Sequence, residues 1–251
     1  MEQKNKIVSL YPLTKFYLAI SIICVSIVMP GILSKVICFL GINILAIVSG
    51  VAGVFIHRLK NSIGILFIIL LLIQTFFYPK GEVIFSIWIF NAKWEGFWFA
   101  LKLGFTLLCV GGSLIWFFAV TLEKDFVLAL EKKGMSPKAS YVVLSTLQMV
   151  PVLKKKSQTI MNAQKARGVE TEGSLLVRAK VFIPTIIPLV LSSITGTEER
   201  ALTLEARGFS SNTVHTHLYD IHASKQDKLV NMIITILLVL VIIGRIILWI
   251  I

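Results

Sequence analysis

The sequence has few charged residues. Asp, Glu, Lys and Arg together make up 15% of its 251 residues, whereas hydrophobic residues make up 56%. Soluble globular domains carry roughly 25% charged and about 45–50% apolar residues. Both deviations argue against a soluble enzyme, a disordered chain or a fibrous protein. Together with a mean hydropathy of +0.85, they predict an integral membrane protein.

Acidic residues and cysteine are scarce as well. The chain has 13 Asp and Glu against 25 Lys and Arg, which gives a formal net charge of +12. In an apolar chain such an excess typically marks cytoplasmic loops rather than a nucleic-acid interface, so no nucleic-acid partner is expected. The three cysteines lie in apolar runs without a CxxC motif, which argues against a disulfide framework or a zinc site.

Motifs for energy conversion or catalysis are also missing. Without GxxxxGK[ST] the chain cannot hold ATP phosphates, and its apolar runs contain almost no acidic residue for a proton or sodium relay. HExxH is absent, and Glu198-Glu199 lacks the downstream Arg of an EExxxR motif because Thr203 stands there. His215-x-His217 is interpreted as part of a solvated loop. We therefore expect no catalytic residue, no metal site and no cofactor bound by this chain.

Uncharged stretches predict an all-α integral membrane protein with about five transmembrane helices. A helix that crosses a hydrocarbon core of about 30 Å needs roughly 20 residues. The candidate stretches are residues 16–34 (interrupted by Pro30-Gly31), 36–56, 63–79, 97–120 and 229–251. Residues 1–120 thus form a predicted four-span membrane region, and residues 229–251 form the last span.

Residues 121–228 differ from the rest of the chain. They hold 15 of the 25 basic and 10 of the 13 acidic residues, so we expect amphipathic helices in water. The predicted helices are a short one over 125–133, one over 137–150, and another after Pro151 that runs to the first glycine of the repeat described below. Residues 181–197 are uncharged but contain Pro184 and Pro188. We interpret them as a helix that dips into the membrane, in preference to a sixth span.

The positive residues predict the orientation. A basic turn at 57–60 and the basic region 121–228 favour the cytoplasm, whereas the connection over 80–96 is balanced in charge. We therefore expect a multi-pass protein with a cytoplasmic N-terminus and a cytoplasmic 121–228 region. Trp88, Trp94 and Trp98 are then placed at the outer interface, as in an aromatic belt.

A tripeptide occurs twice in this charged region. Ala166-Arg167-Gly168 lies in QKARGVE, and Ala206-Arg207-Gly208 lies in LEARGFS. Each copy has the residues that a helix end favours, because Gly adopts the left-handed C′ conformation and Arg suits the negative end of the helix dipole. Ala permits close approach to a partner, and the guanidinium of Arg pairs bidentately with a carboxylate. Two such helix ends predict two docking tips. A matched pair of tips is expected on the same side of the membrane.

These motifs resemble those of the transmembrane coupling subunit (EcfT, or T component) of energy-coupling factor (ECF) transporters, which includes the cobalt-transport CbiQ proteins. The resemblance covers most of the chain. It is most specific in AQKARGVE and EARGF with IPTIIPLVLSSI between them, and it extends to YPLTKFYL and LQMVPVLKK.

The resemblance implies a fold and a function. Long cytoplasmic coupling helices would cross, and their tips, Ala166, Arg167, Gly168, Ala206, Arg207 and Gly208, would dock into two ATP-binding-cassette ATPase subunits of the EcfA type. ATP and Mg²⁺ would bind only to those subunits. The coupling helices would also hold a membrane-embedded S component, which delivers a vitamin or metal ion to the cytoplasm of a bacterial cell.

Two alternatives stay open from the sequence. One is an intramembrane enzyme, and the other is the permease subunit of a conventional ABC importer, which has one coupling helix per chain. The transported substrate, the sharing of one T component among several S components, and the identity of the two ATPases are left undecided by the residues.

Overall fold

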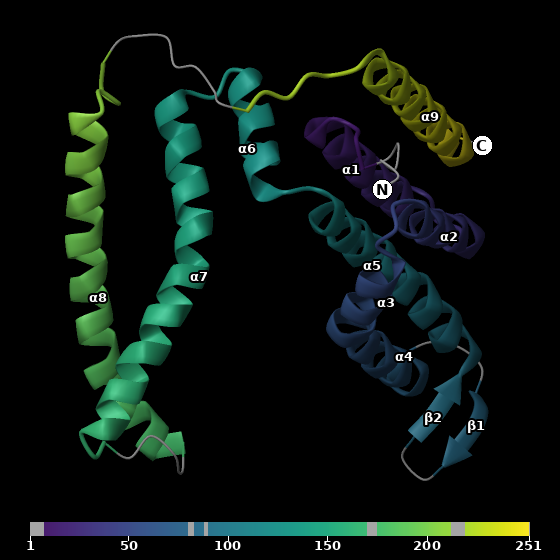
Figure 1. Cartoon of the computed structure of the whole chain (residues 1–251). Helices are drawn as coiled ribbons and strands as arrows, with labels where there is room; N and C mark the ends of the chain where they lie inside the picture. Colours follow the sequence, from purple (N-terminus) through teal and green to yellow (C-terminus); the bar gives the residue numbers. More distant parts are fainter. Residues whose placement is uncertain (1–7, 80–82, 88–89, 170–174, 212–218, 251) are drawn as a thin grey trace. The chain divides into compact units, whose positions relative to one another are not determined.

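The computed structural model describes residues 8–79, 83–87, 90–169, 175–211 and 219–250 (Figure 1). The chain divides into two compact units. The bundle unit comprises Met1–Lys133 and Ile221–Ile251, and the hairpin unit comprises Gly134–Asp220. The described residues are predominantly helical, which confirms the predicted all-α membrane fold.

The bundle unit contains the apolar helices. Its elements are α1 (Pro12–Val28), α2 (Ile32–Val48), α3 (Ala52–Leu59), the π-helical turn η1 (Lys60–Gly64), α4 (Ile65–Phe77), α5 (Trp94–Val120), α6 (Glu123–Lys132) and α9 (Lys225–Ile250). Among the described residues, three helices are long and apolar enough to cross a membrane, Ala52–Phe77, Trp94–Val120 and Lys225–Ile247. With 17 residues each, α1 and α2 lie at the lower limit for a span, so the count of about five stays a prediction.

The boundaries of the first spans differ from the sequence prediction. The predicted span over 16–34 ends early, because Pro30 forces Met29 into an extended conformation with ψ 123°. The predicted span over 36–56 is divided at residues 49–51, where Gly50 has a φ of 72°. The predicted turn at 57–60 is wrong, since these residues continue the helix that starts at Ala52.

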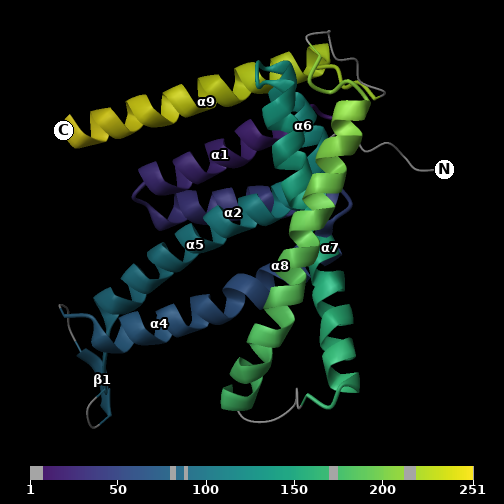
Figure 2. The same cartoon turned by 90° about the vertical axis from the view of Figure 1, so that its left-hand side faces the viewer.

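Helix α5 forms the centre of the bundle unit and contacts α1, α2, α3 and α4. Figure 2 shows it between α2 and α4. Small residues permit this close packing: a Cβ atom added at Gly104 would overlap the Phe67 ring, and one added at Gly112 would touch the Phe55 ring. The core that results consists of Ala19, Ile42, Ala46, Phe55, Leu59, Cys109, Trp116 and Phe117.

The connection between α4 and α5 contains a β-hairpin that the sequence analysis did not predict. Strands β1 (Val83–Ile87) and β2 (Phe90–Lys93) pair antiparallel, with Ile87 opposite Phe90. Trp88 of the predicted aromatic belt lies outside the described residues. Trp94 and Trp98 are exposed and form an edge-to-face pair with ring centroids 5.9 Å apart.

The hairpin unit consists of two long antiparallel helices, α7 (Pro137–Ala166) and α8 (Leu175–Ala206) (Figures 1 and 2). The predicted break at Pro151 is wrong, because this proline lies inside one continuous α7. Likewise, Pro184 and Pro188 lie inside α8. Residues 181–197 form the middle of that helix, and their predicted insertion into the membrane stays a prediction.

Candidate docking site

Both tripeptides end a long helix with the same backbone geometry. Gly168 and Gly208 have φ angles of 81° and 76°, in the left-handed region. In each copy the amide of Gly and the amide of the following residue bond back to carbonyls of the last helical turn, which is a Schellman motif. The bonds are Gly168 N to Lys165 O (3.0 Å), Val169 N to Gln164 O (3.1 Å), Gly208 N to Glu205 O (2.9 Å) and Phe209 N to Leu204 O (3.0 Å). The predicted helix ends are therefore confirmed.

The six residues of the two tripeptides are all exposed. Arg167 and Arg207 occupy the C-cap position, where their positive charge is favoured by the carbonyl end of the helix dipole. Within the described part of the chain, neither guanidinium has a hydrogen-bond or ion-pair partner. Both side chains therefore have their five N–H donors available to a partner.

The structure separates the two tips rather than bringing them together. Because α7 and α8 run antiparallel, their C-terminal ends lie at opposite ends of the hairpin unit (Figure 1). A helix of 32 residues, such as α8, is about 48 Å long at 1.5 Å per residue. The tips are thus separated by roughly one helix length.

The two tips are equivalent in local structure. Each of the two antiparallel helices carries the same tripeptide at its C-terminal end, with the same pattern of cap hydrogen bonds. The hairpin unit therefore has two similar, separate arginine-bearing helix ends.

Polar contacts fix the crossing of α7 and α8. Lys156 Nζ donates to the Ser192 carbonyl at 3.3 Å, and Gln164 Nε2 donates to the Pro184 carbonyl at 3.2 Å. The Pro184 carbonyl lacks its normal helical donor four residues later, because Pro188 has no N–H. Gln164 replaces that donor and so ties the last turns of α7 to the proline-containing part of α8. The sequence analysis missed this contact, although Pro188 signals a free carbonyl.

The second tip is supported by an aromatic pair. Phe209, directly after Gly208, packs on Tyr141 of α7 with ring centroids 5.1 Å apart. Helix α7 begins shortly before Tyr141, and its N-cap, Ser136, accepts a hydrogen bond from Ala139 N at 3.3 Å. The end of α8 that carries Arg207 is therefore held in place, because Phe209, two residues later, packs on α7.

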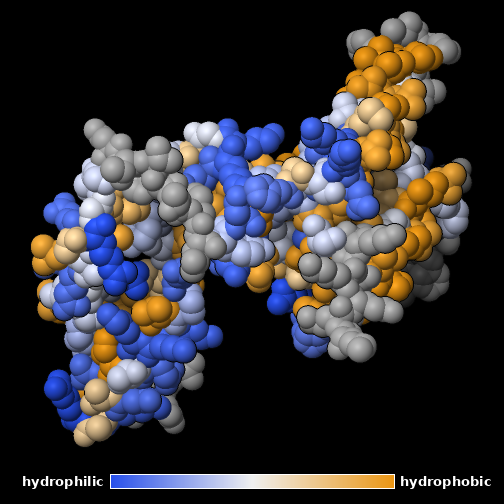
Figure 3. All heavy atoms as spheres, turned by 45° about the horizontal axis from the view of Figure 1, so that its top comes forward, coloured by the Kyte–Doolittle hydropathy of each residue, from blue (hydrophilic) through white to orange (hydrophobic). Residues whose placement is uncertain are grey.

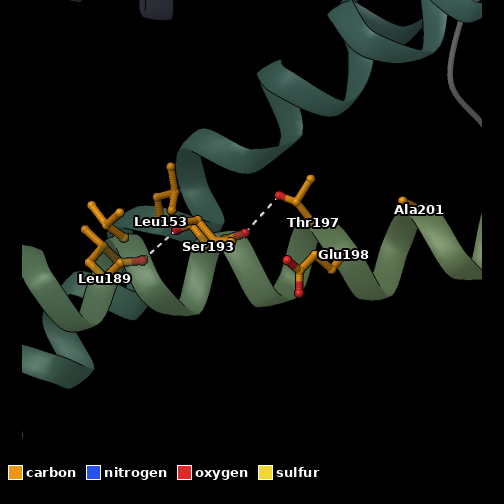
Figure 4. Close-up of a pocket in the computed structure, with 8 residues that line it drawn as sticks. Leu153, Leu189, Ser193, Thr197, Glu198 and Ala201 are labelled. Carbon is orange, nitrogen blue, oxygen red and sulfur yellow. Dashed lines mark hydrogen bonds between the residues drawn. The ribbon is translucent and has the colours of Figure 1, made fainter.

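Open grooves lie on the surface of the crossing. One groove has a volume of about 530 Å³ and is lined mainly by apolar side chains of α8, together with Leu153 of α7. Figure 4 shows Leu189 and Ser193 beside Leu153. Thr197 and Glu198 lie further along α8. A second groove of about 470 Å³ includes Lys155 and Lys156 beside Ile160 and Pro188. Both are shallow clefts between two helices.

Nothing in the described part of the chain forms a metal centre. No group of three or more His, Cys, Asp or Glu side chains comes together there. Glu198 and Glu199 are exposed on α8, and His215 and His217 lie outside the described residues.

The chain is similar to known transport proteins. Residues 3–218, which include both tips, match the model of the CbiQ family, described as cobalt transport protein. The chain is 31% identical over 183 residues to the energy-coupling factor transporter transmembrane protein EcfT of Ruminiclostridium cellulolyticum, covering 69% of this chain and 68% of that protein. It is 31% identical over 212 residues to EcfT of Lactobacillus helveticus, and this match covers 80% of this chain and 74% of that protein. It is also 31% identical over 192 residues to EcfT of Streptococcus equi, a match that covers 73% of this chain and 71% of that protein.

Proposed function

Because this chain belongs to the CbiQ family and is a T component of an energy-coupling factor transporter, we propose that it couples ATP hydrolysis by partner subunits to substrate import. In this role it is a multi-pass protein of a bacterial cell membrane, with its N-terminus and its hairpin unit in the cytoplasm. Its partners are two ATP-binding-cassette ATPase subunits, identical or different, and one membrane-embedded S component that binds the substrate.

The observation that carries the proposal is the matched pair of helix ends. Arg167 and Arg207 lie on matching Schellman caps at the ends of two antiparallel helices, and both are exposed. A pair of ATPase subunits offers two similar surfaces, one for each tip. One chain would therefore contact both ATPases, with one tip on each.

Docking relies on the chemistry of the tripeptide. Arg supplies a planar fork of donors for a carboxylate or for free carbonyls in an ATPase groove. Ala, one residue earlier, leaves the helix end narrow enough to enter that groove. Gly lets the chain turn away directly after the Arg without strain. The chain itself performs no catalysis, and ATP and Mg²⁺ are bound by the ATPase subunits.

The apolar surface of the hairpin unit is the proposed contact for the S component. Exposed apolar side chains occur on both helices, among them Leu147, Val150, Ile187, Val190, Leu191 and Ile194. Exposed apolar surface of this kind marks interaction sites. When the ATPases move the two tips, the crossing angle of α7 and α8 changes and the S component is displaced, which releases a vitamin or a metal ion to the cytoplasm.

Copurification tests the docking assignment. The tagged chain is expressed with its ATPase and S subunits, as wild type and as Arg167→Ala, Arg207→Ala and the double variant. Truncating one partner of an interfacial charge pair costs about 2–5 kcal/mol. Each single variant should therefore recover at least tenfold less ATPase, and the double variant should lose the ATPases and uptake while inserting normally into the membrane.

Arg200→Ala is the matched control, because Arg200 is an exposed arginine of α8 away from the tips. It should retain wild-type recovery of the ATPases. Wild-type recovery and uptake in the double variant would show that the tips are not the docking residues.

Subunit stoichiometry separates the proposal from a conventional ABC permease. The mass of the intact complex should correspond to one copy of this chain with two ATPases. Two copies of this chain with two ATPases would favour the permease. Purification without any ATPase, with a hydrolytic activity in the chain alone, would favour the intramembrane enzyme.

A further inference from the structure

The chain passes between the two units at two points that lie side by side. It leaves the bundle unit after Lys133, at the end of α6, and returns to it at Ile221, shortly before α9. Lys132 Nζ, in the last turn of α6, donates to the Ile221 carbonyl. The outgoing and returning segments are thus joined to each other at the edge of the bundle unit.

A buried lysine lies at the centre of this junction. Lys15, in the first turn of α1, is only 4% exposed. Its Nζ donates to the Val8 carbonyl at 2.7 Å and to the Val120 carbonyl, the last of α5, at 3.4 Å. Asp125 in the first turn of α6 and Asp227 in the first turn of α9 lie near enough to attract its charge. One ammonium group is thus hydrogen-bonded to the end of α5 and lies in the field of carboxylates at the starts of α6 and α9.

Asp227 joins the starts of two helices. It is 2% exposed, and its two carboxylate oxygens accept from Tyr11 N at 2.8 Å and from Ser224 N at 2.7 Å. The bond to Ser224 is the reverse half of a capping box at the start of α9. The bond to Tyr11 satisfies the N-cap amide of α1, so a single carboxylate stabilises the first turns of both helices.

Further polar contacts extend the junction. Asn231 Nδ2 donates to Thr14 Oγ1 at 3.3 Å, one turn along α9 from Asp227. The Tyr11 hydroxyl donates to the Ala129 carbonyl of α6 at 3.4 Å. Helices α6 and α9, which carry the two connections to the hairpin unit, are therefore both bonded to the start of α1.

We propose that Lys15, together with Asp125 and Asp227, is a positioning residue that makes this junction rigid, so that movement of the hairpin unit is transmitted to the membrane helices instead of being lost in flexible connections. The proposal rests on the coupling function proposed above. Buried charged groups contribute little net stability compared with apolar contacts of similar size, but their hydrogen bonds fix the geometry of the groups that they join. The junction lies where the chain leaves the bundle unit and re-enters it.

The proposal is tested with the transporter reconstituted in vesicles, in which substrate uptake and ATP hydrolysis are both measured. The variants are Lys15→Met and the double variant Lys15→Met/Asp125→Asn, which also removes the opposing charge of Asp125 and keeps the bonds of the Asp227 carboxylate to Tyr11 and Ser224. Both should bind the ATPases and hydrolyse ATP at half the wild-type rate or more, while substrate imported per ATP falls at least tenfold. Tyr17→Phe, which removes only an exposed α1–α9 contact to Thr235, is the matched control and should keep wild-type coupling.

The double variant separates positioning from stability. Neutralising Lys15 and Asp125 together should recover part of the melting temperature lost in Lys15→Met without restoring uptake per ATP. Recovery of uptake together with stability, or a proportional fall of uptake and hydrolysis, would overturn the proposal.

A measurement without partner subunits keeps this proposal separate from the coupling function. Spin labels replace Phe118 of α5 and Met232 of α9, both exposed, in a background without the native cysteines. The distribution of distances between the labels should be at least twofold broader in the double variant than in wild type. An unchanged width would overturn the rigid junction, whereas failure of the wild type to bind ATPases would overturn only the coupling function.

Discussion

The bundle unit and the hairpin unit bury very different kinds of side chain. The bundle unit has an apolar core that includes Phe55, Trp116 and Phe117, whereas the buried side chains described in the hairpin unit are the small polar Ser140 and Thr185. The surface of the bundle unit is nevertheless rich in apolar side chains, and that of the hairpin unit is mainly hydrophilic with separate apolar residues (Figure 3).

The difference in buried and exposed side chains matches the different surroundings of the two units. The apolar surface of the bundle unit suits a lipid environment, and packing around α5 gives the unit a core of its own. Two crossing helices enclose almost nothing, so the hairpin unit is held by helix caps and by the polar contacts at the crossing, and binding of the proposed ATPases would stabilise it further. A unit that must move with its partners is expected to have the lower intrinsic stability.

Hydrogen exchange gives the largest expected contrast between the units. In the isolated chain, amides in the middle of α7 and α8 should exchange at least a hundredfold faster than those in the middle of α5, because local opening exposes little apolar surface there. Binding of the ATPases should slow exchange in α7 and α8 only. Equal protection of the two units in the isolated chain would contradict the comparison.

Overpacking tests the core of the bundle unit. In Gly104→Leu the new side chain would overlap the Phe67 ring, which should destabilise the protein by about 1–3 kcal/mol and lower its melting temperature in detergent. Gly53→Leu is the matched control, since no atom lies within 4 Å of an added Cβ there. A similar melting temperature for the two variants would show that α4 and α5 do not pack closely.

In the hairpin unit, backbone strain at a tip should have a smaller effect on stability than overpacking has in the bundle unit. Gly208→Val places a β-branched residue at a φ of 76°, which costs about 1–2 kcal/mol and should weaken ATPase binding about 5- to 30-fold. Gly208→Asn is the control, because Asn tolerates the left-handed conformation, and it should bind nearly as wild type. Equal binding by both variants would indicate that the tip geometry is not needed for docking.

The sequence was sufficient where structure depends on local chemistry. The Gly residues of the two tripeptides predicted both C-caps, and Pro30-Gly31 marked the interruption between α1 and α2. Uncharged runs predicted the apolar helices, because long stretches without charge are rare outside membranes.

Long-range contacts limited the rest of the prediction. The turn at Gly50 lies in an uncharged run, so hydropathy gives no sign of it. Pro151 is accommodated inside α7, which packs on α8, although a proline in isolation predicts a helix end. The contact between Asp227 and Tyr11 joins residues 216 positions apart, which no local pattern encodes.

Cross-linking from the two tips tests the central claim most directly. A photoreactive amino acid replaces Ala166 or Ala206, which leaves both arginines in place, in a complex that contains two distinguishable ATPase subunits. Each position should cross-link to an ATPase, the two positions should favour different subunits, and a chain labelled at both should yield one copy linked to two ATPases. Cross-links from both positions to lipid or to the chain itself, with none to an ATPase, would contradict the account.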